Sequence, residues 1–298
     1  GSRGSRNKNK MKKLLKSRFF PLCATGIFSV ILMCIATVYD LDISVVAVGA
    51  RENSTVLRIV SYALQVIGEW PGPVFGSFAA AIIVRSLSAR TEKHRALAWR
   101  LSGFALEYIL MLYCVRATLK PFEEYRAAFL ISCIMIPASL ALIITRLTEI
   151  IPEKTLAELF VPALVTFFAA LAVLITVQFM KMLWGRIRFR DFGEDISRFV
   201  PWYKIDFFSG YNSFPSGHTA NMAIIFAFPL WLAATGKSRK TVVISYVVIG
   251  ICTAAMAISR IFIGAHFLSD ITVGFYISFA ATEAVRLILK KVYAKKAE

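Results

Sequence analysis

The chain has 298 residues, of which 57% are hydrophobic, and a formal net charge of +17. An ordinary soluble domain draws roughly half of its residues from the apolar types. In this chain, apolar stretches of about 20 residues, each long enough to cross a bilayer as a helix, recur from end to end. The composition therefore excludes an ordinary soluble domain and predicts an all-α, polytopic transmembrane helical bundle.

Eight apolar segments are predicted to span the membrane. In chain order they are residues 19–39, a segment within 56–84 that begins near Pro73, and residues 101–119, 127–145, 159–180, 217–234, 241–258 and 267–289. Between the first two spans, residues 42–51 are expected to form a short interfacial helix. The apolar pattern that follows Ser54 and Thr55 is expected to form a second helix along the membrane, which ends before Pro71-Gly72-Pro73.

The distribution of charge predicts the orientation of the chain. Residues 1–18 are interpreted as a tag remnant and a basic cytoplasmic tail, and residues 19–298 as a single membrane-embedded domain. With the N-terminus inside and alternating spans, 23 of the 35 Lys and Arg residues fall on the inner side. This is the positive-inside bias, so both termini are predicted to be cytoplasmic. Membrane lipids, and not nucleic acid, are the expected partners, and the pattern indicates no oligomeric state.

Two short motifs and two upstream cations place functional groups at the ends of apolar segments. They are Lys181, Arg188, Pro215-Ser216-Gly217-His218, Ser259-Arg260, His266 and Asp270. A neutral imidazole can attack phosphorus, a second imidazole can give a proton to the leaving oxygen, and Lys and Arg can hold the phosphoryl oxygens. The set predicts a phosphoryl-transfer site. Three cations around one phosphate supply the charge that magnesium supplies in kinases, so neither a metal nor another cofactor is expected.

Local spacing suggests how these groups are held. Lys181 and Arg188 are seven residues apart, so a continuing helix would place both on one face, and Arg260 joins them from another span. Ser216 and Gly217 are expected to expose backbone N–H groups at a helix N-terminus, where anions bind.

His266 and Asp270 are four residues apart and are expected to share a helical face. Asp270 would then hold one ring nitrogen of His266 and leave the other free for attack, as the acid of a catalytic triad orients its histidine. Spacing alone leaves open which of His218 and His266 is the nucleophile.

The motifs resemble those of the type 2 phosphatidic-acid phosphatase superfamily of lipid phosphatases. The family pattern is a lysine, six residues and Arg-Pro, then Pro-Ser-Gly-His, then Ser-Arg, five residues, His, three residues and Asp. The resemblance covers roughly residues 178–273, and Phe189 stands where the family usually has proline. Proline would fix φ directly after Arg188, so without it the orientation of the Arg188 side chain is expected to be less restricted. The resemblance implies that His266 is the nucleophile, which forms a phosphohistidine, and that His218 is the general acid.

The resemblance also implies a core of six spans, so residues 101–158 are interpreted as an inserted hairpin. We expect this hairpin to be a scaffold or a dimer face, and the alternative is a wall of the lipid groove. Alternation of the spans places all the motif segments on the outer face of the membrane.

Four basic residues in the loop between the first two motifs are interpreted as solvated or in contact with a headgroup: Arg186, Arg190, Arg198 and Lys204. Glu69 and Glu107 are carboxylates near or within apolar segments, which is unusual, and the sequence assigns them no role.

These observations predict a metal-independent lipid phosphate phosphatase of the bacterial inner membrane, with its site facing outside. The resemblance implies undecaprenyl diphosphate, phosphatidylglycerol phosphate or phosphatidic acid as the lipid phosphate substrate. The alternatives are a lipid phosphotransferase that uses the same site and a non-enzymatic lipid transporter. A vanadate-dependent haloperoxidase shares the site pattern, but soluble chains carry that chemistry.

Overall fold

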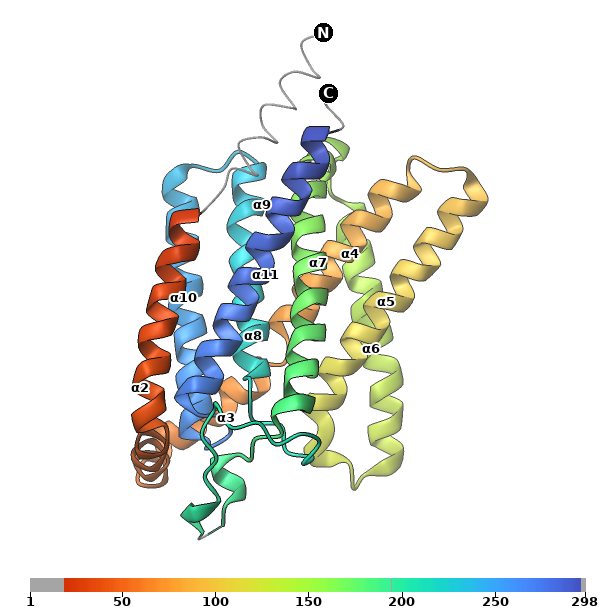
Figure 1. The fold of residues 1–298 in the computed structure, drawn as a ribbon. Helices are drawn as coiled ribbons and strands as arrows, with labels where there is room; N and C mark the ends of the chain where they lie inside the picture. Colours follow the sequence, from red (N-terminus) through yellow and green to blue (C-terminus); the bar gives the residue numbers. More distant parts are fainter. Residues whose placement is uncertain (1–18, 194, 296–298) are drawn as a thin grey trace.

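The computed structural model describes residues 19–193 and 195–295. Residues 1–18, interpreted above as a tag remnant and a cytoplasmic tail, lie outside the described residues. The helices are α2 (Phe19–Glu52), α3 (Thr55–Ile67), α4 (Pro71–Ser88), α5 (Lys93–Leu119), α6 (Arg126–Glu149), α7 (Glu153–Trp184), α8 (Gly217–Ala223), α9 (Phe228–Ala234), α10 (Arg239–Phe262) and α11 (Leu268–Lys295) (Figure 1). Short 3₁₀ turns lie at Lys120–Phe122, Phe189–Asp191, Ile196–Arg198 and Ile224–Ala227.

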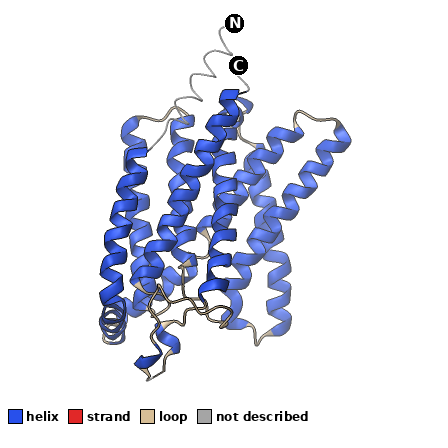
Figure 2. Ribbon diagram, in the orientation of Figure 1, coloured by secondary structure: helices blue, strands red, loops and turns tan. Residues whose placement is uncertain are grey.

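The prediction of an all-α bundle with eight apolar spans is confirmed. The described residues contain helices and loops but no strand (Figure 2). Eight helical segments of this part of the chain are long and apolar enough to cross a membrane. Three of them are interrupted: α3 and α4 form one candidate span, α7 and the turn at Phe189–Asp191 form a second, and α8, the turn at Ile224–Ala227 and α9 form a third. The chain is an integral membrane protein.

The prediction of a separate interfacial helix at residues 42–51 is wrong, because these residues continue α2 without a break. The first predicted span ends at Tyr39, directly before Asp40. The carboxylate of Asp40 is buried, however, and bonded to other side chains, so it does not need to leave the membrane-spanning part of the helix. In a sequence, a buried carboxylate within a helix can therefore be mistaken for the polar end of a span.

Helix α3 begins after Ser54, as predicted, and Ser54 caps it by accepting a hydrogen bond from the N–H of Leu57. A turn at Gly68–Trp70 separates α3 from α4, and Pro71 occupies the first turn of α4, where its missing N–H costs little. A Cβ on Gly68 would lie 2.8 Å from Cδ2 of His218. Glycine at this position therefore allows the turn to approach that histidine directly.

Packing brings the two halves of the chain together around α7 and α11. Helix α4 packs against α5, α6 and α7, and α11 packs against α2, α7 and α8. One buried cluster joins α4, α7 and α9 through Ala79, Ile82, Leu156, Leu159, Ala163 and Trp231. Figure 1 shows that the long loop after α7 and the connection between α10 and α11 lie at the same end of the bundle. This arrangement places the predicted motif segments at one end.

Candidate active site

A single cavity of about 570 Å³ brings the predicted histidines and cations together. Its lining includes Lys181, Arg188, Gly217, His218, Arg260 and His266. Much of the remaining wall is apolar and comes from α4, α5 and α7. The predicted site residues Ser216 and Asp270 are fully buried behind this lining and do not border the cavity.

The expectation that Lys181 and Arg188 lie on one face of a continuing helix is wrong. Helix α7 ends at Trp184, and Gly185 follows in the left-handed region with φ +52°. A Cβ at this position would collide with the carbonyl oxygen of Asp206, so glycine is required for close approach as well as for φ. Arg188 then lies in extended backbone, and the chain reversal brings it to the same cavity as Lys181.

Buried guanidinium groups of the site have free hydrogen-bond donors. Within the part of the chain that the structure describes, Nε of Arg188 and Nη2 of Arg260 are buried and have no hydrogen-bond partner. Buried polar groups normally have partners, and an unpaired donor is costly. Because both side chains line the cavity beside Lys181, these donors favour an anion as the missing partner.

The turn at Ser216-Gly217 differs from its predicted role. The N–H of Ser216 donates to the backbone oxygen of Asp270 at 2.9 Å, and its hydroxyl caps α8 by accepting from the N–H of Thr219. The N–H of Ser216 is therefore not free for an anion, and its side chain is fully buried and does not border the cavity. Gly217 does line the cavity, and a Cβ there would lie 3.4 Å from Nζ of Lys181. A Cβ on Gly274 of α11 would meet the backbone oxygen of Ser216, so glycine at this position allows α11 to approach the turn closely.

His266 precedes α11 instead of sharing a helical face with Asp270, as the sequence predicted. Its Nδ1 lies 3.6 Å from Oδ2 of Asp270, which is an ion-pair distance but too long for a hydrogen bond. Burial lowers the pKa of His266 to about 3, although the nearby carboxylate opposes that shift. The imidazole is therefore neutral at pH 7, with its Nδ1 on the side of Asp270.

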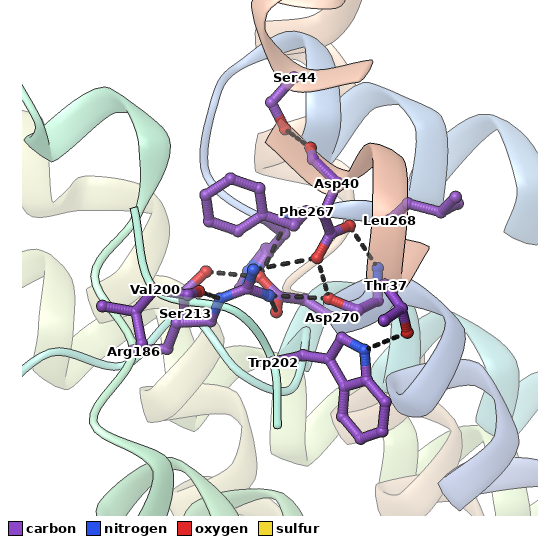
Figure 3. A network of polar contacts seen from close by, with 12 residues as sticks. Thr37, Asp40, Ser44, Arg186, Val200, Trp202, Ser213, Phe267, Leu268 and Asp270 are labelled. Carbon is purple, nitrogen blue, oxygen red and sulfur yellow. Dashed lines mark hydrogen bonds and ion pairs between the residues drawn. The ribbon is translucent and has the colours of Figure 1, made fainter. Parts of the chain in front are cut away.

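Asp270 is held by a network that the sequence did not reveal (Figure 3). Its Oδ1 accepts a hydrogen bond of 2.7 Å from Nη1 of Arg186. Its Oδ2 accepts from the hydroxyl of Ser213 at 2.5 Å and from the N–H of Phe267 at 2.9 Å. The carboxylate is thus fixed by three donors, and it faces His266 without a hydrogen bond to it.

Arg186 was interpreted as a solvated or headgroup residue, and that interpretation is wrong because its side chain is fully buried. Besides Asp270, its guanidinium donates to Asp40 at 2.9 Å and to the backbone oxygen of Val200 at 2.8 Å. It also lies 4.0 Å from the centre of the Phe267 ring, a cation–π contact. Asp40 in turn accepts from the N–H of Ser269 at 3.0 Å. Helix α2 is thereby tied to the first turn of α11, directly after His266.

His218 has a carboxylate partner from the N-terminal half of the chain. Its Nε2 lies 3.1 Å from Oε1 of Glu69, in the turn between α3 and α4. The other oxygen of Glu69 accepts a hydrogen bond of 3.1 Å from the hydroxyl of Tyr113 in α5. The sequence flagged Glu69 as a carboxylate near an apolar segment, but its partner depends on the fold.

The other charged residues noted in the sequence are dispersed. Arg190 borders the cavity, whereas Arg198 and Lys204 are exposed in the long loop. Glu107 is buried between α5 and α6, where it accepts a hydrogen bond of 2.9 Å from Thr145, and it does not border the cavity. Among the residues that the structure describes, no group of three or more His, Cys, Asp or Glu side chains could hold a metal ion.

Comparison with known proteins finds a family match for the C-terminal part of the chain. Residues 162–293 match the model of the PAP2 superfamily. No curated protein and no solved structure matched the chain. The matched segment contains Lys181, Arg188, the Pro215–His218 turn, Arg260, His266 and Asp270, whereas Glu69 and Tyr113 lie before it. This C-terminal segment is therefore similar to the PAP2 superfamily, the type 2 phosphatidic-acid phosphatase superfamily.

Proposed function

We propose that the protein is a metal-independent lipid phosphate phosphatase. Members of the PAP2 superfamily are generally phosphatases. The observation that supports the proposal most is the convergence of Lys181, Arg188 and Arg260 with two histidines on one cavity, whose other walls are apolar. The cationic end suits a phosphate group, and the apolar walls suit the chain of a lipid.

In the proposed reaction, Nε2 of neutral His266 attacks phosphorus and forms a P–N bond. The bond from phosphorus to the leaving oxygen breaks, and His218 gives that oxygen its proton. Water then attacks the phosphohistidine, His218 takes a proton from the water, and the P–N bond breaks. The products are inorganic phosphate and the dephosphorylated lipid. Lys181, Arg188 and Arg260 stabilise the charge on the phosphoryl oxygens.

The apolar wall of the cavity gives the inserted hairpin a role in this proposal. Helix α5 contributes Leu106, Ile109, Leu110 and Ala117 to the lining. The sequence favoured a scaffold or a dimer face for residues 101–158, and the structure instead supports the alternative, a wall of the lipid groove. We propose a lipid phosphomonoester or diphosphate as the substrate, with undecaprenyl diphosphate, phosphatidylglycerol phosphate and phosphatidic acid as candidates. We further propose that the cavity faces the outside of a bacterial inner membrane.

The direct test is phosphate release from these three lipids in detergent with excess chelator. We expect turnover of at least one lipid by the wild type and none by His266→Ala. Complete loss of wild-type activity on chelation would contradict the metal-independent mechanism. Phosphate release that requires an added lipid acceptor would indicate a phosphotransferase. Lipid binding or transport retained in His266→Ala, with no turnover by the wild type, would indicate a transporter.

A further inference from the structure

Glu69 and His218 form a contact that the proposed chemistry does not yet use. The two side chains approach to 3.1 Å, and both are about four-fifths buried. Tyr113 donates to the second oxygen of Glu69, and Cys114, the next residue of α5, donates its thiol to the backbone oxygen of Glu69 at 3.4 Å. The carboxylate is therefore held from α5 on one side and directed at His218 on the other.

The charges around His218 make this carboxylate chemically significant. His218 shares the cavity with Lys181, Arg188, Arg190 and Arg260, all of which are cations that disfavour a protonated imidazole. Glu69 is the one acidic side chain among the residues that line the cavity in the described part of the chain. A general acid must carry its proton when the leaving oxygen departs. Without a neighbouring carboxylate, His218 would be poorly suited to that step.

We propose that Glu69 is a positioning residue that keeps His218 protonated and aims it at the leaving oxygen. This inference rests on the proposed phosphatase function. Because Nε2 of His218 lies 3.1 Å from Oε1 of Glu69, we assign the other nitrogen, Nδ1, to the leaving group. Tyr113 fixes Glu69 through its hydrogen bond and so acts one step further from the substrate. The family match begins at residue 162, so this part of the site comes from segments outside it.

Glu69 stays ionised throughout and exchanges no proton. His218 passes its Nδ1 proton to the leaving oxygen as the bond to phosphorus breaks, and becomes neutral. It regains a proton at Nδ1 from the water that later attacks the phosphohistidine. Glu69 stabilises the charged form before the first step and again after the second step.

Dependence on the leaving group tests this role. An alkoxide leaves badly without a proton, whereas 4-nitrophenolate leaves without help, so dodecyl phosphate and 4-nitrophenyl phosphate separate acid catalysis from the rest of the reaction. Loss of general acid catalysis typically costs about 10²–10⁴-fold in rate. We expect Glu69→Gln to lose about 10²-fold or more in kcat on dodecyl phosphate but only a few-fold on 4-nitrophenyl phosphate. Phosphoenzyme should still be trapped from the aryl substrate.

Three further variants separate this role from a structural one. Glu69→Asp keeps the charge and should recover part of the loss on dodecyl phosphate. Tyr113→Phe should show the same selective loss in weaker form. Glu107→Gln removes another buried carboxylate, which lies away from the cavity, and should leave the ratio of the two rates unchanged.

The outcomes distinguish this inference from the proposed function. If the wild type hydrolyses neither substrate, the proposed phosphatase function is overturned, and the role of Glu69 falls with it. Suppose instead that the wild type hydrolyses both substrates. If Glu69→Gln then lowers kcat equally for the two substrates, or lowers it for neither, the positioning role alone is overturned. If Glu69→Gln does not fold, Tyr113→Phe provides the test. An equal loss of kcat on both substrates in Tyr113→Phe also overturns the inference.

Discussion

The guanidinium of Arg186 donates a hydrogen bond of 2.7 Å to the carboxylate of Asp270, and both side chains are fully buried. Arg186 also pairs with Asp40, 146 residues earlier in the chain. One buried cation thus lies between two buried carboxylates, and the group that faces His266 is fixed from behind. Removal of one partner of a buried ion pair leaves an uncompensated charge. The network therefore links the stability of the fold to the geometry of the site.

The first prediction concerns this network. Arg186→Gln leaves Asp40 and Asp270 without their cation, so we expect a loss of about 3–5 kcal/mol in stability and loss of phosphate release. Arg198→Gln, in the same loop but exposed, is the matched control and should be close to wild type in both. Thermal unfolding in detergent measures the stability. Equal unfolding midpoints for the two variants would contradict a structural role for the buried pairs.

The second prediction concerns Asp270→Asn. Both oxygens of Asp270 accept hydrogen bonds, from Arg186, Ser213 and Phe267. The amide of asparagine would direct its N–H groups at one of these donors, so we expect this variant to lose stability as well as activity. In a catalytic triad the same exchange costs about 10⁴-fold in rate. A variant with wild-type unfolding and full phosphate release would show that the charge of Asp270 is dispensable.

The third prediction concerns the roles of the two histidines. If His266 is the nucleophile, His266→Ala should abolish acid-labile phosphate on the protein after quenching. His218→Ala should slow turnover but still form some phosphoenzyme from 4-nitrophenyl phosphate, whose leaving group needs no proton. The measurement is radiolabelled phosphate bound to the quenched protein. Phosphoenzyme that persists in His266→Ala and disappears in His218→Ala would reverse the assignment.

The sequence predicts the spans well because a transmembrane helix requires little more than apolar length. It also predicts that the motif segments meet at one end of the bundle, although Ser216 and Asp270 lie behind the cavity and do not line it. Gly185 is a helix-stop signal that the spacing argument for Lys181 and Arg188 overlooked, whereas the close approach of the backbone at Asp206 is visible only in the structure. The partners of Asp40, Arg186 and Glu69 could not be predicted either, because each pair joins distant segments, and nothing in a single sequence reports such contacts.

The fourth prediction concerns pH. Burial lowers the pKa of His266 from 6.5 to about 3, so between these values the unfolded chain binds a proton that the folded protein does not. The stability contributed by neutral His266 is therefore present above about pH 6.5 and falls as the pH is lowered through this range. His266→Asn lacks the titrating group. We expect the unfolding midpoint of the wild type, relative to this variant, to fall between pH 8 and pH 5, and an unchanged difference would contradict the shift.

The fifth prediction tests the wall formed by α5. Ala117 lines the cavity, whereas Ala105, on the same helix, is exposed and does not line it. A tryptophan at position 117 would take volume needed by a lipid chain, so Ala117→Trp should raise KM for a long-chain lipid phosphate about tenfold or more, the scale for misfit in an apolar pocket. Its effect on 4-nitrophenyl phosphate should be small, because that substrate has no chain to place. Ala105→Trp is the matched control and should alter neither KM. If Ala117→Trp raises KM equally for both substrates, or for neither, α5 does not form the wall that receives the lipid chain.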